Sequence, residues 1–150
     1  MSDDITVTLA TPDDLDTLAP LFDGYRQFYR QPTDLAAARD FLRERLTRGE
    51  SVIFLAWRGG NAAGFTQLYP TFSSVSMKRL WILNDLFVVA DARRAGVAQA
   101  LLERARRHAV ETGAKGLTLQ TARDNIPAQA LYESLGWTRE QMFYAYNLLV

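Results

Sequence analysis

The segment Arg93–Ala98 combines two arginines and a glycine at a spacing that could bind an anion. It follows an apolar run, Leu80–Val89, and it precedes apolar residues at helical spacing: Val97, Leu101, Leu102, Ala105 and Ala109. Backbone N–H groups and the positive end of a helix dipole meet at such a strand-to-helix turn, and Gly96 lets an anion approach the main chain. The segment matches neither the P-loop nor the dinucleotide motif. It therefore predicts a phosphate-type anion site of another kind, with an ordinary turn carrying two surface arginines as the alternative.

Asn125 and Tyr132 form a second candidate group. They are seven residues apart, about two helical turns, so both side chains can face one cleft. A phenol hydroxyl, whose pKa is ordinarily near ~10, is suited to donate a proton to a departing thiolate. The alternative is a core tyrosine whose hydroxyl reaches the surface.

Asn84 and Asp85 are adjacent polar residues inside the apolar run. Their burial costs free energy unless they are paired. Neighbouring strand residues point to opposite faces, so only one of the two can face a given cleft unless a bulge intervenes. Asp85 could orient a cationic amine or take up its proton, and a structural role in a distorted strand is the alternative.

The composition indicates an ordinary globular chain and excludes several chemistries. The 150 residues are 48% hydrophobic, and 17 basic residues balance 17 acidic ones, so neither nucleic acid nor an anionic membrane is expected as a partner. There is no cysteine and a single histidine, which excludes cysteine nucleophiles and makes a metal site unexpected. The start of the sequence carries no signal pattern, and no apolar stretch reaches the ~18 residues of a membrane span. We therefore expect a soluble cytoplasmic protein.

The hydrophobic patterns predict the elements that position these residues. The expected strands are Ile5–Leu9, Ser51–Trp57, Ala62–Tyr69, Leu80–Val89, Leu117–Thr121, Trp137–Arg139 and Met142–Val150, with a loop over Pro70–Met77. The expected helices start after Thr11, span Thr33–Arg48, run from Val97 to Gly113, and run from Asn125 to Gly136. This order predicts one α/β domain over residues 1–150, with antiparallel early strands and a later β-α-β crossover.

Together these motifs resemble the GNAT superfamily of N-acetyltransferases over nearly the whole chain. The family pattern V-x-P-x-x-[RQ]-x-x-G-x-[GA] is matched by Val88–Ala98, and the pattern L-Y-E-x-x-G-[FW] by Leu131–Trp137. Ala90 stands where the family commonly has proline, and Ala98 replaces the second glycine.

The resemblance implies a mixed, mostly antiparallel sheet flanked by about four helices, with a splayed parallel strand pair that holds acetyl-CoA. It also implies that the amine attacks the thioester directly and that Tyr132 protonates the coenzyme A thiolate. The cofactor-binding residues that it implies are Leu86, Phe87, Val88, Arg93, Arg94, Ala95, Gly96, Val97, Ala98, Gln99, Asn125 and Tyr132.

The strand Asn84–Val88 looks closest to the branch that contains diamine and histone-tail acetyltransferases, many of them homodimers. The neutral Asn84 weakens a polyamine assignment, whereas Asp85 matches a common acidic position and is assigned to the amine. The first helices wall the acceptor site in this family, so the further candidate substrate contacts are Tyr25, Phe28 and Tyr29.

A small-molecule primary amine is the expected acceptor. A peptide lysine or N-terminus, and a non-catalytic acyl-CoA-binding module, are the alternatives. The apolar last segment, Phe143–Val150, would leave an uncovered strand edge and so favours a homodimer.

Overall fold

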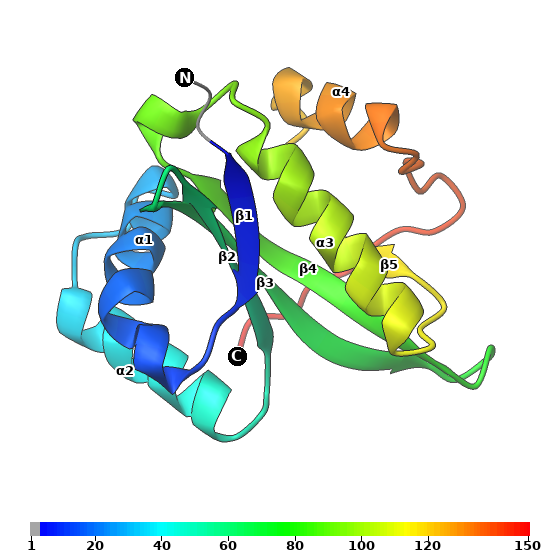
Figure 1. The fold of residues 1–150 in the computed structure, drawn as a ribbon. Helices are drawn as coiled ribbons and strands as arrows, with labels where there is room; N and C mark the ends of the chain where they lie inside the picture. Colours follow the sequence, from blue (N-terminus) through cyan, green and yellow to red (C-terminus); the bar gives the residue numbers. More distant parts are fainter. Residues whose placement is uncertain (1–3) are drawn as a thin grey trace. The chain divides into compact units, whose positions relative to one another are not determined.

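A five-stranded sheet in the order β1-β2-β3-β4-β5 organises the first 119 residues of the computed structural model, which describes residues 4–150 (Figure 1). Strands β1 to β4 are antiparallel neighbours, and β5 pairs parallel to β4. The mixed sheet with one parallel pair confirms the predicted fold class. The strands are β1 Ile5–Leu9, β2 Val52–Arg58, β3 Asn61–Ser73, β4 Lys78–Val88 and β5 Leu117–Thr118.

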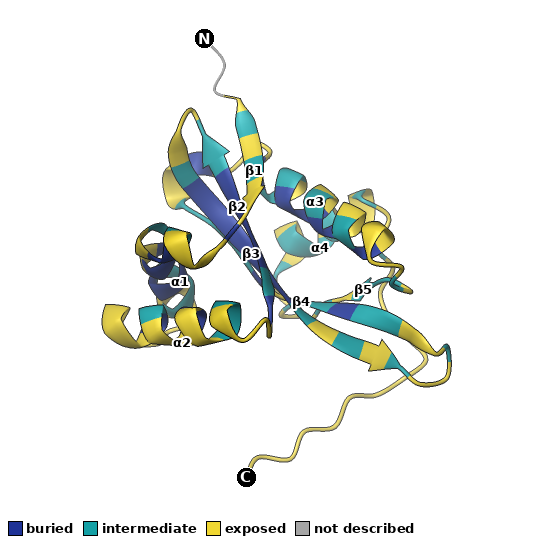
Figure 2. Ribbon diagram, turned by 60° about the horizontal axis from the view of Figure 1, so that its bottom comes forward, coloured by how far each residue is buried: buried dark blue, intermediate teal, exposed yellow. Residues whose placement is uncertain are grey.

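Helices cover both faces of this sheet. Figure 2 shows α1 (Leu15–Phe28) and α2 (Leu35–Thr47) on one face and α3 (Val97–Glu111) on the other. Short 3-10 turns, η1 (Pro12–Asp14) and η2 (Ala90–Ala92), precede α1 and α3. The core under α1 and α2 includes Leu18, Leu42 and Phe65, all fully buried.

Capping residues set the ends of the helices. Thr11 and Asp14 form the capping box that starts the first helical segment, as the sequence predicts. Asp34 accepts a hydrogen bond from the N–H of Ala37 at 3.1 Å, so α2 begins at Leu35 rather than at the predicted Thr33.

The loop predicted over Pro70–Met77 is wrong for its first half, because β3 continues to Ser73. Proline cannot donate to a strand ladder, which is why its position suggested a loop. The last residue of β3 that pairs with β2 is Leu68, and Pro70 pairs only with Trp81 of β4. At Pro70 only the side of β3 toward β4 is paired. The other side needs no backbone N–H donor, so a proline is tolerated.

The parallel pair is brief. β5 pairs with β4 only at Trp81–Leu117 and Ile82–Thr118, whereas β4 continues to Val88. The strand predicted over Leu117–Thr121 is therefore shorter than expected.

Residues 120–150 form a second, smaller compact unit. Its helix α4 (Ile126–Ser134) confirms the predicted helix, with Asn125 as N-cap and Gly136 in the left-handed region at φ 93°. The strands predicted over Trp137–Arg139 and Met142–Val150 are wrong: neither segment pairs with a strand within the described residues. An alternating pattern needs a neighbouring backbone to become a strand, and here none is provided.

The single-domain organisation over residues 1–150 stays a prediction.

No helix in the described part of the chain is long and apolar enough to cross a membrane.

Candidate active site

A β-bulge at Asn84 places the two adjacent polar residues of β4 on one side of the sheet. Gln67 of β3 pairs with Asp85, but the next residue, Leu68, pairs with Leu83. Asn84 is therefore the extra residue of the bulge. Neighbouring strand residues can face one cleft only if a bulge intervenes, and the bulge at Asn84 meets that condition for Asn84 and Asp85.

The bulge also shifts the alternation along β4, so that odd-numbered residues face α3 before it and α1 after it. Before it, Trp81 contacts His108 of α3, with ring centroids 4.7 Å apart. After it, Phe87 contacts Tyr25 of α1, with centroids 6.4 Å apart. Asp85 thus lies on the side of α1 and α2.

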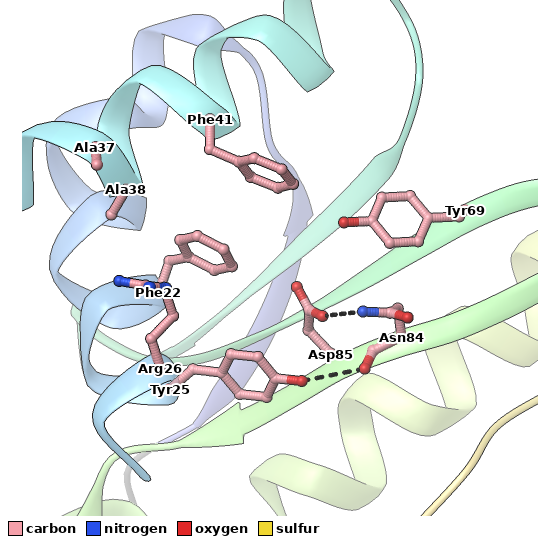
Figure 3. A pocket seen from close by; sticks show the side chains of 9 residues that line it. All are labelled: Phe22, Tyr25, Arg26, Ala37, Ala38, Phe41, Tyr69, Asn84 and Asp85. Atoms are coloured by element: carbon pink, nitrogen blue, oxygen red, sulfur yellow. Dashed lines mark hydrogen bonds between the residues drawn. The ribbon is translucent and has the colours of Figure 1, made fainter. Parts of the chain in front are cut away.

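A pocket of about 400 Å³ lies between helices α1 and α2 and strands β3 and β4 (Figure 3). It brings together three of the predicted substrate residues, since Tyr25, Asn84 and Asp85 all line it. The residues that line the pocket are Phe22, Tyr25, Arg26, Ala37, Ala38, Phe41, Tyr69, Asn84 and Asp85.

Asp85 is the buried acid of this pocket, with 2% of its surface exposed. Its two carboxylate oxygens accept hydrogen bonds from Asn84 Nδ2 at 2.7 Å and from Gln67 Nε2 at 2.5 Å. Burial raises the pKa of Asp85, and hydrogen bonding by Asn84, Gln67 and Tyr25 opposes that rise. A carboxylate held by neutral donors in an apolar pocket can accept a proton or hold an ammonium group.

Two tyrosines flank Asp85. The Tyr25 hydroxyl donates to the backbone carbonyl of Asn84 at 3.2 Å, and burial raises its pKa above the ordinary value. Burial, with a contribution from the nearby Asp85, raises the pKa of Tyr69 to about 12. Both hydroxyls are therefore protonated donors at neutral pH.

The sequence reasoning did not assign Tyr69 or Gln67 to the site. Both residues lie on β3 at alternate positions with Phe65, and Gln67 lies directly opposite Asp85. Pairing the two predicted strands in this register would have identified Gln67, but the register depends on the bulge.

Phe28 and Tyr29 lie outside the pocket lining. They are 60% and 56% exposed, at the end of α1. The Tyr29 ring packs edge-on against Tyr25, with centroids 5.1 Å apart, and so extends the aromatic wall beyond the pocket. The structure brings neither residue to Asp85.

The predicted anion site takes the form of a turn before α3. Gly96 has a φ of 88° and Arg94 a φ of 65°, both in the left-handed region, and α3 starts at Val97. No side chain caps the helix start, and its first N–H groups have no partner within the helix. The Arg93 Nε donates to the carbonyl of Val88 at 3.1 Å, which ties the turn to the end of β4. This turn can accept an anionic group.

Asn125 and Tyr132 belong to the second unit. Asn125 Oδ1 accepts a hydrogen bond from the N–H of Ala128 at 3.3 Å and caps α4. The Tyr132 ring lies near Trp137, with centroids 6.0 Å apart. Their roles toward a cofactor stay predictions.

Comparison with known proteins gives a consistent result. Residues 16–137 match the family model described as the acetyltransferase (GNAT) family. The chain is 51% identical over 146 residues to the "Uncharacterized N-acetyltransferase YhfO" of Bacillus subtilis, covering 97% of this chain and 98% of that one. It is 31% identical over 133 residues to a "Probable acetyltransferase" of Haemophilus influenzae, covering 86% of this chain and 89% of that one.

A solved structure shows the same fold at substantial identity. The crystal structure of a probable acetyltransferase superposes with a TM-score of 0.92 at 46% identity, covering 97% of each chain.

Proposed function

This chain belongs to the acetyltransferase (GNAT) family of enzymes, and from that premise we propose that it transfers the acetyl group of acetyl-CoA to a primary amine of a small molecule. The observation that supports the acceptor class is the buried Asp85 in a pocket of about 400 Å³. A pocket of this size suits a small ligand, within the range of ~300–1,000 Å³ typical of such sites.

The residues around the turn before α3 fit the donor. Acetyl-CoA supplies an acetyl group held as a thioester. The left-handed Gly96 and the open start of α3 suit its pyrophosphate, with Arg93 beside it. The residues proposed to surround that group are Arg94, Ala95, Gly96, Val97, Ala98 and Gln99.

The end of β4 also belongs to the proposed donor site. The backbone of Leu86–Val88 would bind the pantetheine arm, because β5 pairs only with Trp81 and Ile82 and leaves this part of β4 without a parallel partner. Asn125 would contact the same donor.

Asp85 and Tyr132 divide the proton transfers in this proposal. Asp85 holds the amine by accepting from its N–H groups and takes up a proton from the ammonium group, which frees the lone pair of the nitrogen for attack. The amine then attacks directly, and the Tyr132 hydroxyl donates a proton to the departing sulfur.

A small amine is favoured over a peptide because the acceptor pocket lies between two helices and two strands. We propose that the strand Asn84–Val88 is similar to that of the branch containing diamine and histone-tail acetyltransferases. Because Asn84 is neutral, this similarity does not extend to a polyamine substrate. A cytoplasmic location, expected from the sequence, also stays a prediction.

We also propose a homodimer, supported by the exposed apolar end of the chain. The residues there that are 79–94% exposed are Met142, Phe143, Tyr144, Tyr146, Leu148 and Leu149. A second copy would cover side chains that a monomer leaves in water.

The test is release of free thiol from acetyl-CoA by the purified full chain over a panel of primary amines. We expect release that depends on the amine, and Tyr132→Phe is expected to lower kcat by about 10²-fold without weakening acetyl-CoA binding. The matched control is Ser134→Ala, which removes an exposed hydroxyl from the same helix. Unchanged kcat in Tyr132→Phe would exclude this tyrosine as the acid, and no amine-dependent release would exclude the proposed reaction.

A further inference from the structure

The acceptor pocket has room for one positive charge at its buried end. Of the nine residues that line it, Asp85 is the one acid and Arg26 the one base. Asp85 receives its hydrogen bonds from the neutral amides of Asn84 and Gln67. The other amide atom, Gln67 Oε1, is buried and accepts no hydrogen bond from the described residues. A single ammonium group beside the Asp85 carboxylate would neutralise the one negative charge of this lining.

The lining of this pocket contains no second carboxylate. On α1, Asp23 is buried but does not line the pocket. Its oxygens accept from the Thr33 hydroxyl at 2.6 Å, Gln27 Nε2 at 3.1 Å and the N–H of Asp34 at 2.8 Å. Asp23 therefore fastens α1 to the start of α2 and does not bind an amine.

The remaining walls are aromatic and small. Phe22 and Phe41 lie nearly parallel, at 5° with centroids 5.6 Å apart, and Tyr25 stacks on Phe22 at 6.2 Å. Ala37 and Ala38 leave space along the α2 side (Figure 3). A flat apolar body gains from contact with such rings, whereas a hydrated chain of amines loses its water without replacement.

Arg26 adds a positive charge on the α1 side of the pocket. Its guanidinium points toward the carbonyl of Pro32, 3.5 Å away. Within a partly buried pocket, like charges repel more strongly than in water. A second ammonium on the acceptor would therefore meet Arg26 and find no second carboxylate in the lining.

We propose that the acceptor is a primary amine carrying one ammonium group on a flat aromatic or apolar body, and that Arg26 makes the pocket discriminate against diamines and polyamines. This inference rests on the proposed acetyl transfer to a small amine and specifies its substrate class.

The test compares phenethylamine with the same molecule bearing an aminomethyl group at the para position of its ring. We expect kcat/KM for the single amine to be higher by about tenfold. Arg26→Gln should reduce this ratio severalfold, mainly by lowering KM for the diamine. The matched control is Arg43→Gln on the exposed side of α2, which should keep the wild-type ratio.

Each outcome separates the two proposals. An equal or greater kcat/KM for the diamine, or an unchanged ratio in a folded Arg26→Gln protein, would overturn the inference while amine-dependent thiol release still supports acetyl transfer. If neither these amines nor the wider panel elicit thiol release, the proposed reaction fails, and the inference fails with it. Calorimetric binding of both amines to the wild-type enzyme in the presence of coenzyme A gives the same comparison without turnover.

Discussion

Asp85 combines a negative charge with near-complete burial, and this combination has opposite consequences for activity and stability. The neutral donors Asn84 and Gln67 hold its oxygens, but burial still raises its pKa. The folded protein therefore binds a proton on the Asp85 carboxyl group more tightly than the unfolded chain does. The contribution of the protonated Asp85 to the free energy of unfolding is fully present below the ordinary aspartate pKa near ~4. It is lost as the pH rises through the raised pKa of the folded state.

We expect Asp85→Asn to be more stable and less active than the wild type at pH 8. The amide removes the buried charge, and after a flip its N–H₂ group can also donate to Gln67 Oε1, which is otherwise without a donor. Thermal unfolding should show a higher Tm, by ~2–4 °C per kcal/mol gained, and this gain should vanish toward pH 4. The kcat/KM for an amine should fall by about 10²-fold.

The control for that measurement is Asp91→Asn, which changes the same chemistry at an exposed position. It should alter neither the activity nor the pH dependence of Tm. A lower Tm for Asp85→Asn at pH 8 would mean that the charge of Asp85 is compensated in the folded state.

Among individual residues, the sequence predicted those whose type is unusual for their surroundings. Asp85 and Asn84 interrupt an apolar strand, so their chemistry could be noticed without a structure. Tyr69 and Phe41 are ordinary apolar or aromatic members of a strand and a helix, and only their packing makes them part of the pocket. Residue type alone does not carry that information.

Gly64 of β3 lies directly against the backbone of β4. A Cβ atom on Gly64 would overlap the carbonyl oxygen of Phe87 and would lie 3.2 Å from the Cα of Val88. Both neighbours are backbone atoms, so a side chain could be accommodated only by moving one strand. The same stretch of β4, Leu86–Val88, is proposed to bind the pantetheine arm.

We therefore expect Gly64→Ala to lower the free energy of unfolding by about 1–3 kcal/mol, as overpacking does elsewhere. It should also weaken acetyl-CoA binding, measured by calorimetry, because the end of β4 is displaced.

Gly116→Ala is the matched control, since a Cβ there meets no atom within 4 Å. Equal stability of the two variants would show that β3 and β4 separate without cost.

At the level of elements, the sequence predicted the helices well because their caps are local. Thr11, Asp34 and Asn125 each cap the start of a helical segment by a side-chain hydrogen bond to a residue a few positions later. Strand ends depend on distant partners. The length of β3 beyond Pro70 and the lack of strands after Trp137 both follow from which backbone lies alongside, and local patterns do not determine this.

For the whole molecule, the exposed apolar end of the chain leads us to expect a dimer. Light scattering coupled to size-exclusion chromatography should give the mass of a dimer at micromolar concentration. Replacing Tyr144 and Leu148 by aspartate should shift the mass toward the monomer, because charges would have to be buried in the interface.

A charge change on the exposed face of α2, Arg43→Glu, is the control and should leave the dimer intact. A monomeric wild-type protein would contradict the proposed assembly.

For the whole molecule, the sequence also predicted the family and the sheet class, because two motifs occur in the right order along 150 residues. The acceptor could not be predicted in the same way. Its pocket is formed by residues from α1, α2, β3 and β4, and their juxtaposition is a property of the folded chain.

The extra residue at Asn84 has a consequence for how this enzyme can change over evolution. Odd-numbered positions of β4 contact α3 before it, as Trp81 does, and contact α1 after it, as Phe87 does. Loss of the codon for Asn84 would leave Leu83 opposite Leu68 and Asp85 opposite Gln67, so the later residues of the strand would keep their faces. Substitutions at Asn84 can therefore alter acceptor preference gradually, whereas its loss would remove in a single step the amide that donates to Asp85 and the carbonyl that accepts from Tyr25.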